Sequence, residues 1–192
     1  MNPADALDKA ALYLAGIPGA AERATSRALN AAGVALRDEA LVAITERYAV
    51  PRSDVTTGFS LVAASPTKLE SLAMLRSGAV AVDHYPHAPT AGGTGGTGRP
   101  ILTAEIRRGS SKAIAGAFVA MLSGGNPHVV IRTGEKTATG KDRLRRLYTM
   151  PVGAMLGVEA VRDRAEDRAL AVLEERIGPE IDRELARAGG AV

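Results

Sequence analysis

Residues 116–133, Gly-Ala-Phe-Val-Ala-Met-Leu-Ser-Gly-Gly-Asn-Pro-His-Val-Val-Ile-Arg-Thr, are the stretch that decides the fold. Gly116–Leu122 is an apolar run of strand length, and His128–Thr133 carries Val129 and Ile131 at the period-2 spacing of a strand. The five residues between these runs form a turn and are too few for a helical crossover. The stretch therefore predicts two adjacent antiparallel strands.

More strands are expected on the N-terminal side of this pair. Phe59–Ala64 and Leu69–Arg76 have strand length and are joined by the turn-forming group Ser65-Pro66-Thr67. Ile101–Arg108 alternates apolar and polar residues, which is typical of a half-buried strand. We therefore expect an antiparallel meander over residues 59–133.

The first fifty residues are expected to be helical. Asn2 is suited to the N-cap of a first helix, with Pro3 at its first position. Gly16-Ile-Pro-Gly19 interrupts the pattern, and a longer Ala-rich helix is expected from about Ala20 to Tyr48. Its predicted buried stripe consists of Leu29, Gly33, Leu36, Ala40 and Ile44, with most charged residues off this stripe.

A further helix is predicted over residues 152–188. Gly178-Pro179 is expected to kink or split it. Its apolar stripe is Val158, Val161, Ala165, Ala169, Val172, Leu173, Ile177, Ile181 and Leu185. The predicted fold class is α+β, with long N-terminal helices and a C-terminal helix packed around an antiparallel β-meander, in one domain over residues 1–192.

The amino-acid composition excludes several classes of protein for this chain. The chain has no cysteine, which excludes disulfides and thiolate chemistry, and it suits a reducing cytoplasm. Aromatic residues make up only 3 % of the chain, so close helix packing is favoured over ring-lined ligand pockets. No apolar run approaches the length of a bilayer span, and no signal peptide or membrane contact is expected.

Two predicted loops have few large apolar side chains that could pack against a core. Residues 86–100 contain Gly-Gly-Thr-Gly-Gly-Thr-Gly and are predicted to be mobile when unbound. Residues 134–146 are predicted to form a basic loop. Three interpretations of this loop remain open: a solvated segment, a contact for an acidic neighbour subunit, or a contact for DNA. Its candidate contact residues are Lys136, Lys141, Arg143, Arg145 and Arg146, set against Glu135 and Asp142.

The chemical motifs in the chain are incomplete. Gly134–Asp142 resembles a phosphate-binding loop, but five residues separate its glycines and Asp142 stands where Ser or Thr is required. His84 and His87 with Asp83 offer metal ligands, yet Pro86 intervenes and no fourth ligand is evident. No nucleophile–base pair is found. We therefore assign no catalytic residue, metal or cofactor.

Five segments, in their order and spacing, carry a resemblance to a known family. They are Ile17-Pro-Gly-Ala-Ala-Glu-Arg-Ala-Thr-Ser-Arg-Ala-Leu-Asn-Ala-Ala32, Arg47-Tyr-Ala-Val-Pro-Arg-Ser-Asp-Val55, Gly116–Leu122, His128–Gly134 and Leu147–Gly157. Together they resemble the phage minor tail protein Z, or tail-completion, family over nearly the whole chain. The glycine run 92–98 has no counterpart in that family.

The resemblance implies a non-enzymatic virion protein that completes the head-proximal end of a long phage tail and allows the tail to join the head. It implies a ring, expected to be hexameric, that contacts the tail terminator or tail tube and the head-completion or connector proteins. The expected location is the tail or neck of the virion, after assembly in the host cytoplasm. Contact between basic side chains and DNA in the channel is a further expectation.

Two other functions compete with this one. The first is a non-specific nucleic-acid-binding module that uses the basic segment 136–146, and it predicts a steep salt dependence of DNA binding. The second is a hydrolase without a recognisable motif, for which no nucleophile can be nominated.

Overall fold

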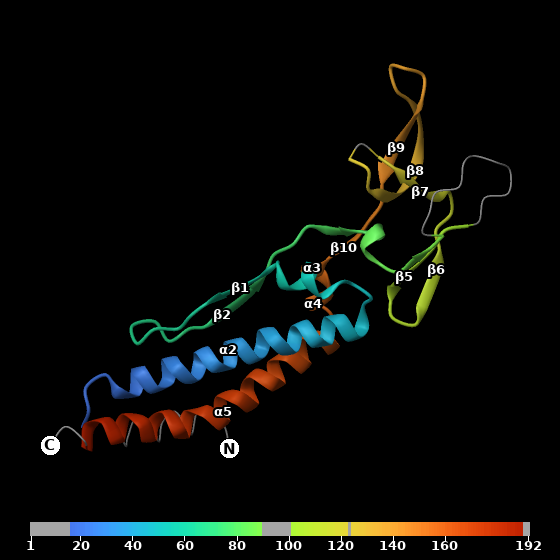
Figure 1. The fold of residues 1–192 in the computed structure, drawn as a ribbon. Helices are drawn as coiled ribbons and strands as arrows, with labels where there is room; N and C mark the ends of the chain where they lie inside the picture. Colours follow the sequence, from blue (N-terminus) through green and yellow to red (C-terminus); the bar gives the residue numbers. More distant parts are fainter. Residues whose placement is uncertain (1–15, 90–100, 123, 190–192) are drawn as a thin grey trace. The chain divides into compact units, whose positions relative to one another are not determined.

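The computed structural model describes residues 16–89, 101–122 and 124–189, and it confirms the α+β class with antiparallel strands (Figure 1). The helices are α2 (Ala20–Arg47), α3 (Arg52–Thr56), α4 (Val152–Leu156) and α5 (Glu159–Gly189), with a 3-10 helix η1 at Val82–His84. The strands are β1 (Phe59–Val62), β2 (Leu72–Leu75), β3 (Ala79–Ala81), β4 (His87–Ala88), β5 (Thr103–Arg107), β6 (Ser110–Ala113), β7 (Ala117–Met121), β8 (Pro127–Lys136), β9 (Asp142–Arg146) and β10 (Tyr148–Pro151).

The chain divides into two compact units, whereas the sequence pattern predicts one domain over residues 1–192. The helical unit comprises Met1–Ala43, Gly58–Arg76 and Leu156–Val192. The strand unit comprises Ile44–Thr57 and Ser77–Met155. Each unit is described separately below.

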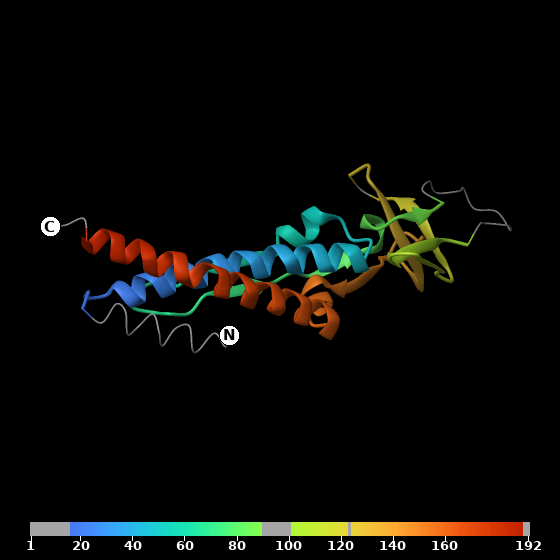
Figure 2. The same ribbon diagram turned by 90° about the horizontal axis from the view of Figure 1, so that it is seen from below.

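Helices α2 and α5 lie side by side and antiparallel in the helical unit (Figures 1 and 2). Buried Ala20, Ala24, Ala28 and Ala32 recur every four residues along α2 and so share one face of the helix. Ile177 of α5 packs against Ala28. Small side chains of this kind allow two helix axes to approach closely.

The predicted buried stripe of α2 is only partly correct. Gly33, Ala40 and Ile44 are buried, but Leu29 and Leu36 are half-buried. The deepest side chains of the N-terminal half are instead the alanines, which cost the helix no side-chain entropy.

Helix α5 is continuous through Pro179, so a split at this residue is wrong. An internal proline removes a backbone donor and costs a helix about 3 kcal/mol. Contacts on both sides of Pro179 oppose this cost, because Ile177 and Ile181 pack on α2. The predicted single helix over 152–188 is also divided, since α4 ends at Leu156 and α5 begins at Glu159.

Strands β1 and β2 form a two-stranded antiparallel hairpin, as predicted for residues 59–76. The side-chain amide of Asn30 brackets the backbone of Ala64: it accepts from the Ala64 N–H at 2.7 Å and donates to the Ala64 carbonyl at 3.0 Å. A Cβ added at Gly33 would overlap the Ser71 hydroxyl. The absence of a side chain at Gly33 therefore lets the hairpin lie close to α2.

The strand unit contains three small sheets in place of one meander. Their strand orders are β10–β3, β4–β5–β6 and β7–β8–β9. The predicted pair around residues 116–133 is confirmed as β7 and β8, with Val119 opposite Val129. A buried cluster fills the unit with Val82, Leu102, Ala104, Ala117, Val119 and Val129.

Two predicted loops are wrong in part. Residues 134–146 are the end of β8, a tight turn and β9, because cross-strand hydrogen bonds pair Arg132 with Leu144 and Lys136 with Asp142. His87–Ala88, placed in the loop 86–100, is strand β4 and pairs with β5. Residues 2–14 and 90–100, and the expectations attached to them, lie outside the described residues.

Candidate polyanion and subunit interface

The basic segment is a β-hairpin with a well-defined turn. The Thr137 N–H donates to the Lys141 carbonyl at 2.8 Å, and the Gly140 N–H donates to the Thr137 carbonyl at 2.9 Å. Gly140 has a φ of +77°, a conformation that glycine adopts without strain. The turn therefore fixes the register of β9 on β8.

The outer part of this hairpin is exposed on both faces. Each residue from Arg132 to Arg143 is exposed, and none of them has a large apolar side chain. The hairpin from Pro127 to Arg146 carries six Lys and Arg against two carboxylates, a formal +4, whereas the entire chain carries +3. The net positive charge of the protein therefore lies on this hairpin, since acidic residues balance the basic residues of the remaining chain.

Cross-strand ion pairs hold the exposed ribbon in place. Asp142 accepts from Arg132 at 3.0 Å and from Lys136 at 2.5 Å. The Lys136 hydrogen bond is the largest cause of the lowered pKa of Asp142. Arg143 pairs with Glu135 at 3.0 Å. These charged pairs take the place of the apolar pairs that usually join two strands.

The five candidate contact residues have different roles in the structure. Lys136 and Arg143 are paired within the hairpin, as described above. Lys141 and Arg145 are exposed and have no ion-pair partner among the described residues. Arg146 has a structural role, because its guanidinium donates hydrogen bonds to both carboxylate oxygens of Asp83, at 3.0 and 2.6 Å.

Asp83 joins η1 to both strands of the hairpin. It contacts Arg146 of β9 and His128 of β8, with a His128 Nδ1 distance of 3.2 Å. Burial by itself would raise the pKa of Asp83, but the hydrogen bonds from Arg146 and His128 outweigh it and lower the pKa to about 2. Asp83 is therefore ionised and fixes the base of the ribbon.

Two arginines on the hairpin lie over aromatic rings. The guanidinium carbon of Arg132 is 4.6 Å from the Phe118 ring centroid, and that of Arg146 is 5.6 Å from the Tyr148 ring. Arg132 is not among the five candidate contact residues, because it falls within the predicted strand His128–Thr133 and outside the predicted basic loop 134–146. Its position two residues after Val130 on β8 was the signal that it shares a sheet face with Phe118.

The histidines do not form the metal site that their spacing suggested. His84 contacts Asp54 at 2.5 Å, and the His87 ring lies 2.8 Å from the Tyr85 carbonyl. Asp83 turns instead to His128. In the described part of the chain, no group of three or more His, Asp or Glu residues is placed to hold a metal ion.

The glycine-bounded segment Gly134–Asp142 consists of the end of β8, the turn at residues 137–141 and the first residue of β9. A phosphate-binding loop of the type considered above leads into a helix whose N-terminus faces the phosphate. The segment therefore lacks the surroundings that such a loop needs.

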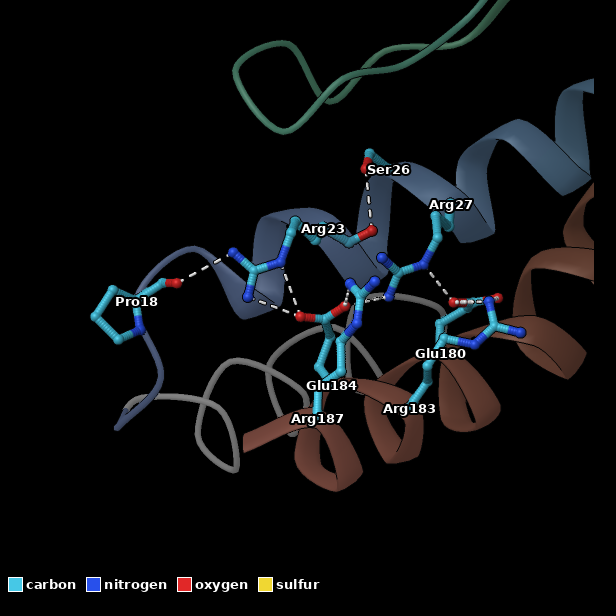
Figure 3. A network of polar contacts seen from close by, with 8 residues as sticks. All are labelled: Pro18, Arg23, Ser26, Arg27, Glu180, Arg183, Glu184 and Arg187. Carbon is cyan, nitrogen blue, oxygen red and sulfur yellow. Dashed lines mark hydrogen bonds and ion pairs between the residues drawn. The ribbon is translucent and has the colours of Figure 1, made fainter. Parts of the chain in front are cut away.

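A second charged cluster lies between α2 and α5 in the helical unit (Figure 3). Glu184, only 1 % exposed, accepts from Arg23 and Arg27, each at 2.7 Å, and lies 3.6 Å from Arg187. Arg27 also pairs with Glu180. Burial alone would raise the pKa of Glu184, yet the Arg23 and Arg27 hydrogen bonds keep it below its ordinary value. This cluster clamps two helices together.

Neither Glu184 nor its arginines were recognised from the sequence. Leu185 was placed on the buried stripe of α5, but it is 37 % exposed and its neighbour Glu184 is buried instead. The available signal was the presence of Arg23 and Arg27 one turn apart on an alanine face, which requires a carboxylate opposite.

Comparison with known proteins adds no relative to this description: no protein-family model, curated protein or solved structure matches the chain. None of the described helices combines the length and the apolar character that a bilayer span requires. The features that define the class of protein are therefore its α+β fold, its paired helices and its basic hairpin.

Proposed function

We propose that this chain is a non-enzymatic structural subunit of a long-tailed bacteriophage, located at the head-proximal end of the tail or in the neck. It completes the tail and allows head–tail joining, as a ring that is expected to be hexameric. Its partners are further copies of itself, the tail terminator or tail tube protein, and the head-completion or connector proteins. The resemblance of the five sequence segments motivates this assignment.

The observation that carries the proposal is the number of open strand edges. Each sheet of the described residues has only two or three strands, and β1–β2 is a hairpin with no third strand. Val62 and Leu72 are opposite each other in that hairpin and are 41 % and 39 % exposed. Unpaired edges and exposed apolar pairs are surfaces on which neighbouring chains can add.

The test is the location and the genetic requirement of the protein. A nonsense allele of its gene should yield filled heads and unjoined tails, and the wild-type chain supplied in trans should restore joining. Electron microscopy of intact particles with an antibody against the chain should label the head–tail junction. Normal particles from the nonsense allele, or particles without the chain, would contradict the proposal.

A second candidate function is non-specific nucleic-acid binding by the β8–β9 hairpin. The observation in its favour is the formal +4 on a ribbon that has no large apolar side chain between residues 132 and 143. Such a surface suits a polyanion better than an apolar protein face. A two-stranded ribbon also fits the major groove of duplex DNA.

This second function predicts duplex binding that weakens steeply as salt rises. Replacing Lys136, Lys141, Arg143 and Arg145 by Glu should abolish binding. Replacing the exposed arginines Arg52 and Arg107 by Glu serves as the control and should leave most of the binding intact. Equal binding by both variants would exclude the hairpin as the contact.

A further inference from the structure

A surface groove runs between α2 and α5 in the helical unit. It has a volume of about 470 Å³. Its apolar lining is Ala31, Val34, Ala35 and Val42 of α2 and Val172 of α5, and its charged rim is Asp38, Glu39, Arg168 and Arg176. Val34 is 42 % exposed, so the apolar floor is open to a partner.

The α5 wall of the groove has a regular pattern. Arg168, Val172 and Arg176 are spaced four residues apart and therefore follow one face of the helix over about 12 Å. Neither arginine has an ion-pair partner among the residues that the structure describes. This wall presents two exposed bases, and between them lies Val172, an apolar side chain that is only 8 % exposed.

The α2 wall does not cancel this charge. Asp38 is paired with Arg37 at 2.8 Å, and Glu39 is paired with Arg164 at 2.5 Å. Both carboxylates therefore already have a cation from the same chain. The charge that remains open to a partner is that of Arg168 and Arg176.

The outer face of the same helix carries the complementary pattern. Glu166, Leu170 and Glu174 have the same four-residue spacing and present an acid, an apolar side chain and a second acid. Leu170 is 49 % exposed. It lies two residues before Val172, about 200° around the helix, so the two stripes are on nearly opposite faces. Within the described part of the chain, the one ion pair of Glu166 is with Arg162, at 3.7 Å, and both side chains are exposed.

We propose that the groove of one copy receives the Glu166–Leu170–Glu174 stripe of a second copy. Leu170 enters the apolar floor beside Val34 and Val172, and the two carboxylates meet Arg168 and Arg176. The equal spacing brings both ion pairs and the apolar contact into register at once. A helix docked in a groove through anchors one turn apart is a common mode of recognition.

Such a contact is head-to-tail, because the groove and the stripe are different surfaces on opposite faces of one helix. Contacts of this kind close into rings or continue as filaments, and they do not stop at a dimer. The inference deepens the proposed self-assembly and rests on it, but it does not depend on the assignment to a phage tail.

The test uses charge-reversed variants of the full chain. The groove variant carries Arg168→Glu and Arg176→Glu, and the stripe variant carries Glu166→Arg and Glu174→Arg. We expect the wild-type protein to self-associate in sedimentation velocity as its concentration rises, and each variant alone to remain monomeric. An equimolar mixture should associate again, because every groove then meets a stripe of opposite charge.

The mixture separates lost contact from lost folding, since a misfolded chain cannot be rescued by a second variant. Circular dichroism of each variant checks the helices. Arg52→Glu with Arg107→Glu changes the net charge as the groove variant does, and it should still self-associate. Leu170→Gln, which keeps the charges, should weaken association at least tenfold.

Three results would overturn the inference: a wild-type chain that is monomeric up to about 1 mM, association of either variant at the wild-type level, or a mixture that stays monomeric. Failure here is distinct from failure of the proposed function. A chain found at the head–tail junction whose variants still associate would remove only the groove contact. A chain absent from particles whose mixed variants associate would remove only the phage assignment.

Discussion

Glu184 is a nearly inaccessible carboxylate whose charge is balanced by arginines from both helices of the helical unit. Replacing it by Gln removes the negative charge and leaves Arg23 and Arg27 facing each other without an acceptor of matching charge. Removal of one partner from a buried ion pair costs about 3–5 kcal/mol. Because the arginines are partly exposed, we expect a loss near the lower end, about 3 kcal/mol.

Urea unfolding followed by helical circular dichroism would measure this loss. Glu175→Gln is the matched control, because Glu175 is an exposed glutamate on the same helix and lies outside the groove and the stripe, and it should change the free energy of unfolding by less than about 0.5 kcal/mol. Equal losses for the two variants would show that the buried cluster contributes no more than a surface charge.

Gly33 is the residue at which α2 meets the β1–β2 hairpin. Gly33→Ala would place a methyl group against the Ser71 hydroxyl and force the two elements apart. Overpacking of this kind costs about 1–3 kcal/mol, although alanine also favours the helix. We expect a net loss of stability in chemical denaturation.

The double variant Gly33→Ala with Ser71→Ala distinguishes the overlap from other effects. The added methyl group would then lie at ordinary contact distance, 3.4 Å, from the Ser71 Cβ. Most of the lost stability should return, because only the helix preference of alanine remains. A double variant as unstable as the single one would refute this explanation.

At the scale of the element, α5 keeps a proline in its interior without ending there. Pro179→Ala restores the missing backbone N–H donor, which stabilises the helix. It also raises the conformational entropy of the unfolded chain, which destabilises the folded state by a smaller amount. We expect a stabilisation of about 1–2 kcal/mol in thermal and urea unfolding. Pro66→Ala, in the turn between β1 and β2, is the control and should give no stabilisation.

Some helices and strands could be predicted from the periodicity of apolar residues, and others could not. Period-2 and period-3.6 patterns were sufficient for α2, β7, the first half of β8 and most of α5, because each of these buries an apolar face. They failed for β9, because four of its five residues are charged and Leu144 is its single apolar side chain, so no period-2 apolar face is visible in the sequence. Pairing there depends on ion pairs across the hairpin, such as Glu135 with Arg143, which a search for apolar periodicity does not detect.

At the scale of the whole molecule, the two carboxylates that have lowered pKa values and little solvent exposure, Asp83 and Glu184, connect stability to pH. Asp83 has a pKa of about 2 in the folded chain, against about 3.9 when unfolded. Its contribution is complete above the unfolded pKa and is lost as the pH falls from about 4 towards 2. Glu184 has the same sign, since its pKa is also lowered by folding.

We therefore expect the free energy of unfolding to be flat between about pH 5 and 7 and to fall below about pH 4. Asp83→Asn should remove about 2 kcal/mol of this acid dependence, measured as the difference between pH 6 and pH 2.5. Hydrogen exchange should show faster opening of β8 and β9 in this variant. An unchanged pH profile would contradict the role given to Asp83.

Across the molecule, the α+β class and the antiparallel arrangement could be predicted from the sequence, but the division into two units could not. That division depends on which strands pair, for example β10 with β3 across more than sixty intervening residues. The candidate site shows the same limit. Five basic residues were identified from local charge, while the anchoring of Arg146 by Asp83 required the folded chain.

The turn at residues 137–141 is a suitable place to insert a tag for imaging. Its side chains are exposed, and the hydrogen bonds that they make to described residues stay within the hairpin, so a short peptide epitope inserted there should be accepted without disturbing the core. In micrographs, an antibody bound to such a tag would show the position of the basic ribbon in any assembly that the chain joins.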